Sequence, residues 1–276
     1  MIATVAAVVV GAGGGALLGR RLAARGVTAE NALQGRQVVA YAVLLGLGGV
    51  FALLYWAHAI PLLPNWLVLL GEASVWPFAQ LVAAGALGLL VLLEWPGRRE
   101  RKRLASMVMG SAALLLCNGF LTYRAMPLLD LLGAPRVVDG VVMQTTSYTC
   151  APATIATLLR ARGDTTATER RVVELAGTTR GGTTTFAEVR AMRRLGLAPE
   201  FVRGLTPESL AARGQAALLH VDEPILTTTI RHAVALLAVD AERRTITIGN
   251  PLYGRQIKSW ESLRGYWTGE AVLVGR

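Results

Sequence analysis

The chain has 276 residues, of which 53% are hydrophobic and 17% are charged, and its formal net charge is +10. This composition is too apolar for an ordinary soluble domain of that length. It predicts a membrane-bound protein.

Four segments in the first half of the chain contain at most one charged residue each. At a rise of about 1.5 Å per residue, each is long enough to cross a hydrocarbon core about 30 Å thick. Small residues at Gly11–Gly15, Gly46–Gly49 and Ala83–Gly88 favour close contacts among these helices or with a partner. We predict a membrane domain over residues 1–123 with four transmembrane helices, at about 1–19, 38–61, 75–95 and 104–122.

Basic residues cluster on two of the predicted loops. The basic residues of the first loop follow the first apolar segment instead of preceding it, which indicates an uncleaved anchor and not a signal peptide. The stretch Pro61–Pro77 lacks Lys and Arg and is interpreted as an interfacial segment at the outer surface. The positive-inside rule then places both basic loops in the cytoplasm and the C-terminal half outside it. The basic residues are Arg20, Arg21, Arg25, Arg36, Arg98, Arg99, Arg101, Lys102 and Arg103.

These loops are interpreted as topology signals that also contact lipid headgroups. They do not interleave aromatic residues as a nucleic-acid site would, so no nucleic-acid partner is expected. The predicted location is a bacterial-type inner or plasma membrane, with a multi-pass anchor and an extracytoplasmic C-terminal domain.

Residues 124–136 form a predicted linker, and 137–276 are long enough for one hydrophobic core. The patterns in this region predict helices first, from Cys150 to about residue 195, and an antiparallel sheet second, from Pro199 to Gly249. The fold class expected is therefore a membrane helical anchor followed by an α+β domain.

Cys150 stands in a polar stretch just before Pro152 and an apolar run. Proline is favoured in the first turn of a helix, so we expect Cys150 at a helix N-terminus, where the helix dipole would lower the thiol pKa. The amide of Gln144 and the backbone N–H of Cys150 are candidate donors to an oxyanion. These features predict a nucleophile.

A cysteine nucleophile needs a base, and the base needs a group that orients it. His232 begins an apolar strand, and Asn250 follows the next strand along the chain. Since consecutive strands joined by a tight turn are neighbours, we expect these two side chains to lie side by side.

The order Gln144, Cys150, His232 and Asn250 before Pro251 resembles the C39 peptidases and C39-like domains. These are papain-fold cysteine proteases best known for removing double-glycine leaders from bacteriocin-type peptides. The resemblance covers roughly residues 137–276 and includes Gly182-Thr183, Leu195-Gly196-Leu197 and Asn250-Pro251-Leu252-Tyr253-Gly254.

The resemblance implies a papain-like fold with Cys150 as nucleophile, His232 as base, Asn250 as orienting residue and Gln144 in the oxyanion hole. Two residues depart from the family pattern. Ala151 stands where Gly is usual, and Asn250 where Asp is usual. Asparagine can fix the imidazole tautomer, but it brings no charge to stabilise imidazolium.

The sequence therefore predicts a membrane-anchored cysteine endopeptidase that cuts a secreted or membrane-associated peptide or protein, with small residues such as Gly-Gly before the cut. Its expected partners are that substrate, membrane lipids and a separate transporter or other membrane protein. Two alternatives stay open: a non-catalytic C39-like module that binds a peptide and recruits it to a transporter, and an amidase or acyl transferase that forms a thioester.

The other residues of chemical interest are interpreted as structural. Cys117 lies in the fourth apolar segment and is expected to be a buried hydrophobic residue. His220 precedes Asp222 and Glu223 and is expected to be an exposed, hydrogen-bonded residue and not a base. Two cysteines and three histidines without ligand spacing predict no metal site. The Gly- and Thr-rich run Thr178–Thr185 lacks a Gly-Lys-Ser/Thr sequence, and no cofactor is expected.

Overall fold

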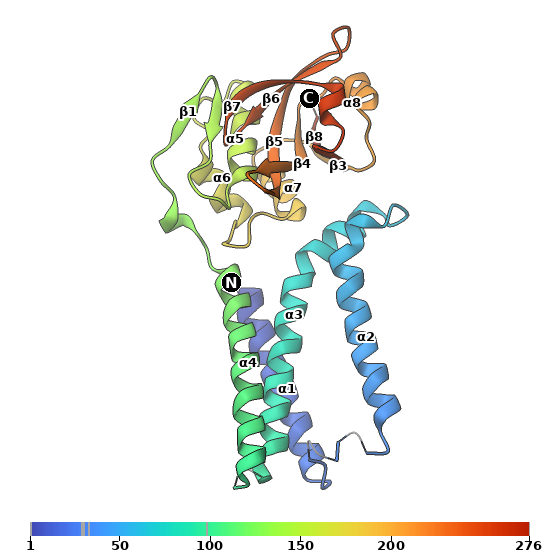
Figure 1. The fold of residues 1–276 in the computed structure, drawn as a ribbon. Coiled ribbons are helices and arrows are strands. Elements are labelled where there is room, and N and C mark those ends of the chain that lie inside the picture. Colours follow the sequence, from blue (N-terminus) through green and yellow to red (C-terminus); the bar gives the residue numbers. More distant parts are fainter. Residues whose placement is uncertain (1, 29–30, 33, 98, 276) are drawn as a thin grey trace. The chain divides into compact units, whose positions relative to one another are not determined.

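The structure is a computed structural model that describes residues 2–28, 31–32, 34–97 and 99–275 (Figure 1). Met1, Arg98 and Arg276, which fall in the predicted first helix, basic loop and C-terminal domain, lie outside the described residues. The chain divides into two compact units. One comprises the residues up to 63 together with 70–126, and the other comprises 64–69 together with the residues from 127 onward.

The first unit consists mainly of long helices, each ending close to a charged or proline-containing segment. Among the described residues, four helices are long and apolar enough to cross a membrane. They are α1 (Ile2–Ala23), α2 (Gln37–Trp56), α3 (Asn65–Glu94) and α4 (Arg101–Ala125), with short 3₁₀ turns at Ala57–Ala59 and Trp95–Gly97.

The predicted start of the third helix was wrong. Asn65, and not Val75, begins α3, so most of the stretch interpreted as interfacial is helical. The carbonyl of Pro64 accepts hydrogen bonds from the N–H groups of Leu67 and Val68, which makes this proline the helix start. Pro77 lies inside α3.

Small residues let α1 and α3 approach closely. A Cβ atom built on Gly15 would lie 2.0 Å from the carbonyl oxygen of Gly85, and one on Gly88 would lie 2.4 Å from that of Ala12. By contrast, α2 has no buried residue, and its Gly46, Gly48 and Gly49 have nothing within 4 Å of such an atom. The small-residue pattern therefore makes an intrachain contact on α1 and α3 but not on α2. Cys117 is exposed on α4, so its expected burial was wrong.

The second unit is built on a six-stranded antiparallel sheet with the order β3-β8-β4-β5-β6-β7. A separate hairpin, β1 (Arg136–Val138) and β2 (Val141–Met143), precedes it. The strands of the sheet are β3 (Pro199–Val202), β4 (Ala217–Ile225), β5 (Thr228–Asp240), β6 (Thr245–Asn250), β7 (Gly254–Ser259) and β8 (Trp267–Val274).

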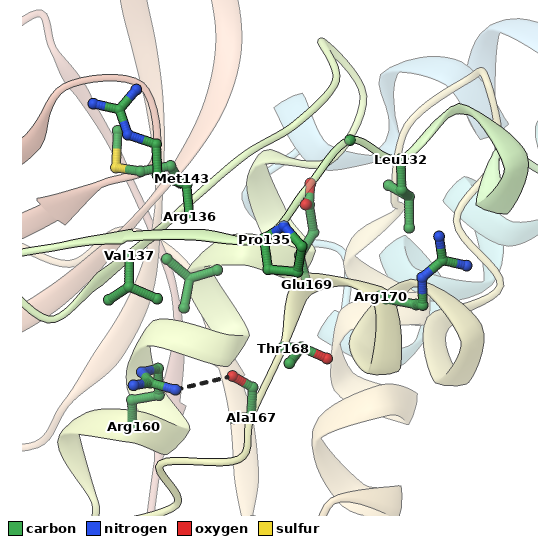
Figure 2. A pocket seen from close by; sticks show the side chains of 12 residues that line it. Leu132, Pro135, Arg136, Val137, Met143, Arg160, Ala167, Thr168, Glu169 and Arg170 are labelled. Atoms are coloured by element: carbon green, nitrogen blue, oxygen red, sulfur yellow. Dashed lines mark hydrogen bonds between the residues drawn. The ribbon is translucent and has the colours of Figure 1, made fainter.

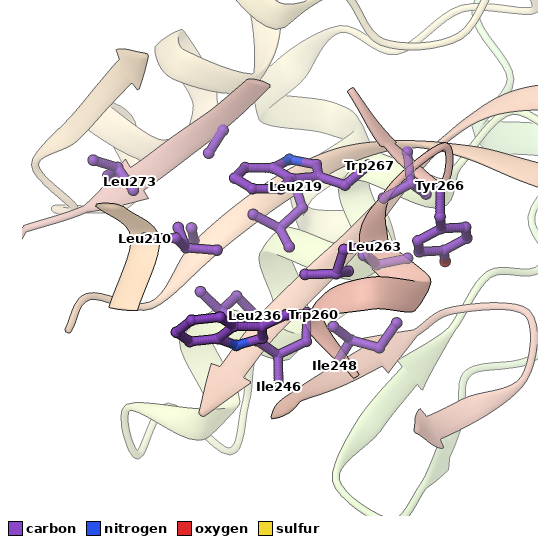
Figure 3. Packing of buried hydrophobic residues seen from close by; sticks show 14 residues of the cluster. Leu210, Leu219, Leu236, Ile246, Ile248, Trp260, Leu263, Tyr266, Trp267 and Leu273 are labelled. Atoms are coloured by element: carbon purple, nitrogen blue, oxygen red, sulfur yellow. The ribbon is translucent and has the colours of Figure 1, made fainter. Parts of the chain in front are cut away.

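Helices cover both faces of this sheet. The alternation of side chains along β4, β5, β6 and β8 points one set of apolar residues at α8 (Pro207–Arg213) and α9 (Trp260–Leu263), where they form a buried cluster (Figure 3). On the other face α5 (Cys150–Ala161) packs on the sheet, followed by α6 (Glu169–Ala176) and α7 (Thr185–Arg194). The α+β arrangement of this unit is as predicted.

Turn and cap chemistry accounts for most of the element boundaries. Thr168 and Thr206 cap α6 and α8, and Gly177 and Gly214 end these helices with positive φ. No element was predicted after Asn250, where β7, α9 and β8 lie.

Candidate active site

Cys150 is the first residue of α5, and Thr149 is the N-cap. The predicted helix start is therefore confirmed. Thr149 Oγ1 accepts a hydrogen bond from the Thr146 N–H at 3.3 Å, which closes the turn that leads into the helix. Because the first N–H groups of a helix have no carbonyl partner inside it, the backbone of Cys150 and Ala151 is left to hydrogen-bond the Cys150 thiol, and both contacts lower its pKa.

The first turn of α5 lies against β5. The β5–β6 ladder ends at the pair Ala235–Gly249, and beyond it the carbonyl oxygen of Ala233 accepts a hydrogen bond from Thr154 Oγ1 at 2.9 Å. Thr154 is one helical turn after Cys150. The thiol is thus held at the part of β5 that carries His232.

His232 and Asn250 lie side by side, as expected from their neighbouring strands. The distance from His232 Nε2 to Asn250 Oδ1 is 3.0 Å, and both residues are almost fully buried. Asn250 Oδ1 also accepts the Leu252 N–H at 2.9 Å. An oxygen that accepts requires a proton on His232 Nε2, so Nδ1 carries the lone pair and is the basic nitrogen.

A buried carboxylate stands behind this pair. Glu223 Oε2 accepts Asn250 Nδ2–H at 2.9 Å and the Tyr266 hydroxyl at 2.7 Å. Glu223 is 5% exposed and Tyr266 is 7% exposed. Sequence reasoning missed both residues, although Glu223 follows Leu219 and Val221 at the period of two that marks one face of a strand. Val221 is paired with His232, which puts Glu223 on the histidine's face.

Gln144 begins the loop between β2 and α5. Its N–H donates to the carbonyl oxygen of Pro251 at 3.0 Å, which fastens it beside the end of β6. Its Nε2 donates to the Thr146 carbonyl at 2.8 Å, and this nitrogen carries a second N–H. Thr145 in the same loop is bound by both carboxylate oxygens of Glu169, at 2.9 and 2.8 Å.

The protonation state of the Cys150 thiol differs from that expected. Burial raises the pKa of the Cys150 thiol to about 11, although the backbone of Ala233 lowers it; the charge of Glu188 raises it further. Burial lowers the pKa of His232, against the opposing effects of the Asn250 hydrogen bond and the Glu223 charge. The expected low thiol pKa was therefore wrong, since loss of solvation outweighs the helix N-terminus. At neutral pH the thiol and the imidazole are both uncharged.

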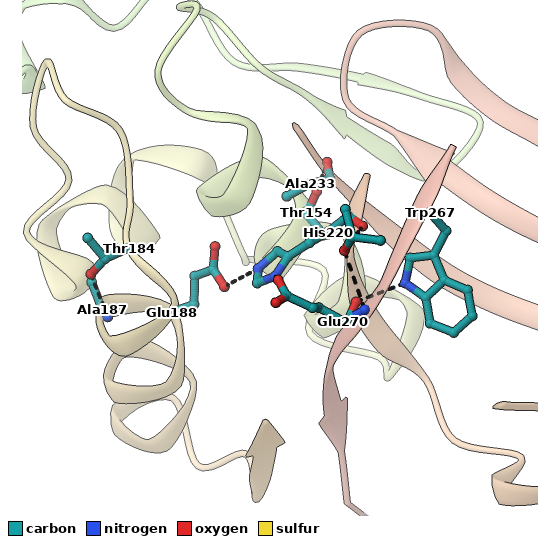
Figure 4. Close-up of polar contacts among 9 residues, drawn as sticks. Thr154, Thr184, Ala187, Glu188, His220, Ala233, Trp267 and Glu270 are labelled. Carbon is teal, nitrogen blue, oxygen red and sulfur yellow. Dashed lines mark hydrogen bonds and ion pairs between the residues drawn. The ribbon is translucent and has the colours of Figure 1, made fainter. Parts of the chain in front are cut away.

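His220 is bound by two carboxylates, and its expected exposure was wrong. Its Nε2 lies 2.9 Å from Glu188 Oε2 and its Nδ1 lies 3.3 Å from Glu270 Oε2, with 13% of the side chain exposed (Figure 4). Burial lowers the pKa of His220, but the two carboxylates outweigh it and raise the pKa to about 10. Both ring nitrogens are occupied, so His220 is an ion-paired structural group and not a base.

A cavity of about 130 Å³ lies apart from the predicted site residues (Figure 2). It is bounded by residues 132–137, β2 and the start of α6, and Arg160 on its wall donates to the carbonyl oxygen of Ala167. Its lining is mostly apolar, and the four predicted site residues are not part of it. Within the described part of the chain, no cluster of His, Cys, Asp and Glu side chains is arranged to hold a metal ion.

Residues 139–276 match the peptidase C39 family. The chain belongs to this family. Two relatives are uncharacterised proteins of Methanothermobacter thermautotrophicus and Methanothermobacter marburgensis. Both are 31% identical to this chain, over 138 and 139 residues respectively. The matched region is 50% of this chain and 89% of each relative.

Two similar solved structures are peptidase domains. That of Streptococcus ComA, described as a bifunctional ABC transporter of a quorum-sensing pathway, has a TM-score of 0.42 and 22% identity over 49% of this chain and 98% of its own. A double-glycine-motif protease from an AMS/PCAT transporter, solved with the leader peptide, has a TM-score of 0.40. Its identity is 20% over 52% of this chain and 94% of its own.

Proposed function

We propose that this C39-family protein is a membrane-anchored cysteine endopeptidase with Cys150 as its nucleophile. The observation that carries the proposal is the 3.0 Å hydrogen bond from His232 Nε2 to Asn250 Oδ1, which leaves Nδ1 as the basic nitrogen of a residue adjacent to Ala233, where the first turn of α5 contacts β5. A neutral thiol beside a neutral imidazole is the starting state for general-base attack.

In the acylation step, the Cys150 sulfur bonds to the scissile carbonyl carbon while the thiol proton passes to His232 Nδ1. The carbon–nitrogen bond then breaks, and the same proton goes to the departing amine. The Cys150 N–H and the second N–H of Gln144 Nε2 are the donors assigned to the oxyanion. Water, deprotonated by His232, then hydrolyses the thioester and restores the thiol.

The substrate class follows from the family and the anchor. We assign a secreted or membrane-associated peptide, with small residues such as Gly-Gly before the cut, because C39 peptidases act on such leaders. The spanning helices would keep the peptidase at the bilayer surface, where such a peptide emerges. The loop arginines support an extracytoplasmic position for the peptidase.

A membrane-impermeant, electrophilic peptide probe tests this proposal in sealed vesicles. The Cys117→Ser protein should be labelled from the outside, and Cys150→Ala and His232→Ala should each abolish labelling. Labelling that appears only after permeabilisation would reverse the orientation. Labelling of Cys150 that survives His232→Ala would remove the histidine from the mechanism.

A further inference from the structure

We propose that Glu223 is a positioning residue for the proposed peptidase: it orients Asn250 and supplies the negative charge that Asn250 lacks. The inference rests on the proposed function. It extends the site from Cys150, His232 and Asn250 to a fourth side chain that does not touch the substrate.

The first part of the argument is geometric. An asparagine side chain presents either its oxygen or its nitrogen to a neighbour, and the two choices favour opposite histidine tautomers. The Glu223 carboxylate accepts and does not donate, so the 2.9 Å contact to Asn250 Nδ2 turns Oδ1 toward His232. Oδ1 in turn selects the tautomer with the proton on Nε2. Glu223 and the Leu252 N–H, which donates to Oδ1 at 2.9 Å, therefore act together to set which imidazole nitrogen is the base.

The second part is electrostatic. When His232 takes the thiol proton, a cation forms in a nearly dry position, since His232 is 5% exposed. A neutral asparagine does not offset that charge. Glu223 is the nearest acidic partner in the chain of contacts, one hydrogen bond beyond Asn250, and its charge acts on His232 in the sense that favours imidazolium. Compared with an aspartate at the position of Asn250, the carboxylate of Glu223 lies one residue further from the histidine.

Tyr266 completes the arrangement. Its hydroxyl donates to the same Glu223 oxygen at 2.7 Å, and burial together with the Glu223 charge raises the pKa of Tyr266, which keeps it a neutral donor. Two donors on one oxygen hold the Glu223 carboxylate in place against Asn250. A buried glutamate is costly unless its carboxylate is paired. Here both of its partners, Asn250 and Tyr266, belong to the site.

The test uses full-length protein in detergent with ¹³C-labelled histidine, so that the pKa of His232 is measured without a substrate. Glu223→Gln keeps the size and an acceptor oxygen but removes the charge. We expect the pKa of His232 to fall relative to the wild type, and kcat/KM on a cleaved peptide to fall by about 10- to 100-fold, mainly in kcat. The resonance of His220 reports in the same spectra whether the sheet is intact.

The double variant Glu223→Gln/Asn250→Asp moves the carboxylate next to His232, and the amide introduced by Glu223→Gln becomes its donor. It should restore kcat/KM to within about fivefold of the wild type and raise the pKa of His232 above that of Glu223→Gln. Glu242→Gln, in the exposed turn between β5 and β6, is the matched control and should change neither quantity.

An unchanged histidine pKa in folded Glu223→Gln would overturn the proposal, and so would a folded double variant no more active than the single one. If Glu223→Gln does not fold, the kcat/KM of the double variant alone tests the proposal. If no peptide is cleaved even by the wild type, the proposed function fails, while the histidine pKa still tests the coupling of Glu223 to His232.

Discussion

The raised pKa of Cys150 makes a quantitative prediction for its alkylation. At pH 7 the ionised fraction of a thiol with a pKa of about 11 is only about 0.01%. The ionised fraction of an unperturbed cysteine of pKa about 8.5 is about 3%. The thiolate fraction is thus about 300-fold smaller. A more basic thiolate is more nucleophilic, by about tenfold for this difference, so the net rate should be about 30-fold lower.

The assay is the rate of iodoacetamide alkylation of full-length Cys117→Ser protein from pH 6 to 10, with free cysteine as the reference. We expect the rate to increase about tenfold per pH unit throughout this range. Glu188→Gln should accelerate alkylation at pH 7, because the Glu188 charge raises the pKa of the thiol. A rate that is independent of pH between 6 and 9 and at least equal to that of free cysteine would show a preformed thiolate–imidazolium pair and refute this reasoning.

Three further predictions concern the fold. The pKa of His220 is raised from 6.5 to about 10, so its ion pairs stabilise the folded chain fully below pH 6.5 and progressively less as pH rises toward 10. Thermal unfolding of the wild type should therefore lose more stability over this window than that of His220→Gln. Gly15→Ala should lower the unfolding temperature of the helical unit by several degrees in detergent, because its Cβ would lie 2.0 Å from the Gly85 oxygen, whereas Gly13→Ala meets nothing within 4 Å. Leu219→Ala removes a fully buried side chain of the cluster and should cost about 2–5 kcal/mol, measured by urea unfolding with tryptophan fluorescence.

Each of these has a contrary result. Parallel stability curves for wild type and His220→Gln from pH 6.5 to 10 would place the histidine outside any stabilising ion pair. Equal melting of the Gly15 and Gly13 variants would contradict the close approach of α1 and α3. A loss below about 1 kcal/mol at Leu219 would mean that the cluster is loosely packed.

The sequence was informative where local chemistry decides the structure. Pro152 after Cys150 predicted the start of α5. The tight turn between two apolar strands brought His232 and Asn250 together. These features depend on residues close in the chain, so a pattern is sufficient to predict them. The catalytic roles of Gln144, Cys150, His232 and Asn250 remain predictions.

Other features depend on tertiary context. Glu223 stands between Asp222 and Pro224, which resembles an exposed turn, and the pairing of β4 with β5 is needed to show that it lies on the same face as His232. The thiol pKa depends on burial by the whole domain, which outweighs the local effect of the helix N-terminus. Pro64 and Pro77 both stand in the apolar stretch Pro61–Pro77, and no local pattern distinguishes them. Pro64 immediately precedes α3, whereas Pro77 lies within it.

Product masses test the central claim most directly. Full-length protein would be incubated with peptides that contain double-glycine and other small-residue sites, and the products compared with those of Cys150→Ala and His232→Ala. We expect two fragments whose masses sum to that of the peptide plus one water, formed by the wild type and lost in both variants. An unchanged peptide that still binds would indicate a recruiting module, and a product with a new covalent linkage would indicate acyl transfer; either result would contradict the assignment as a peptidase.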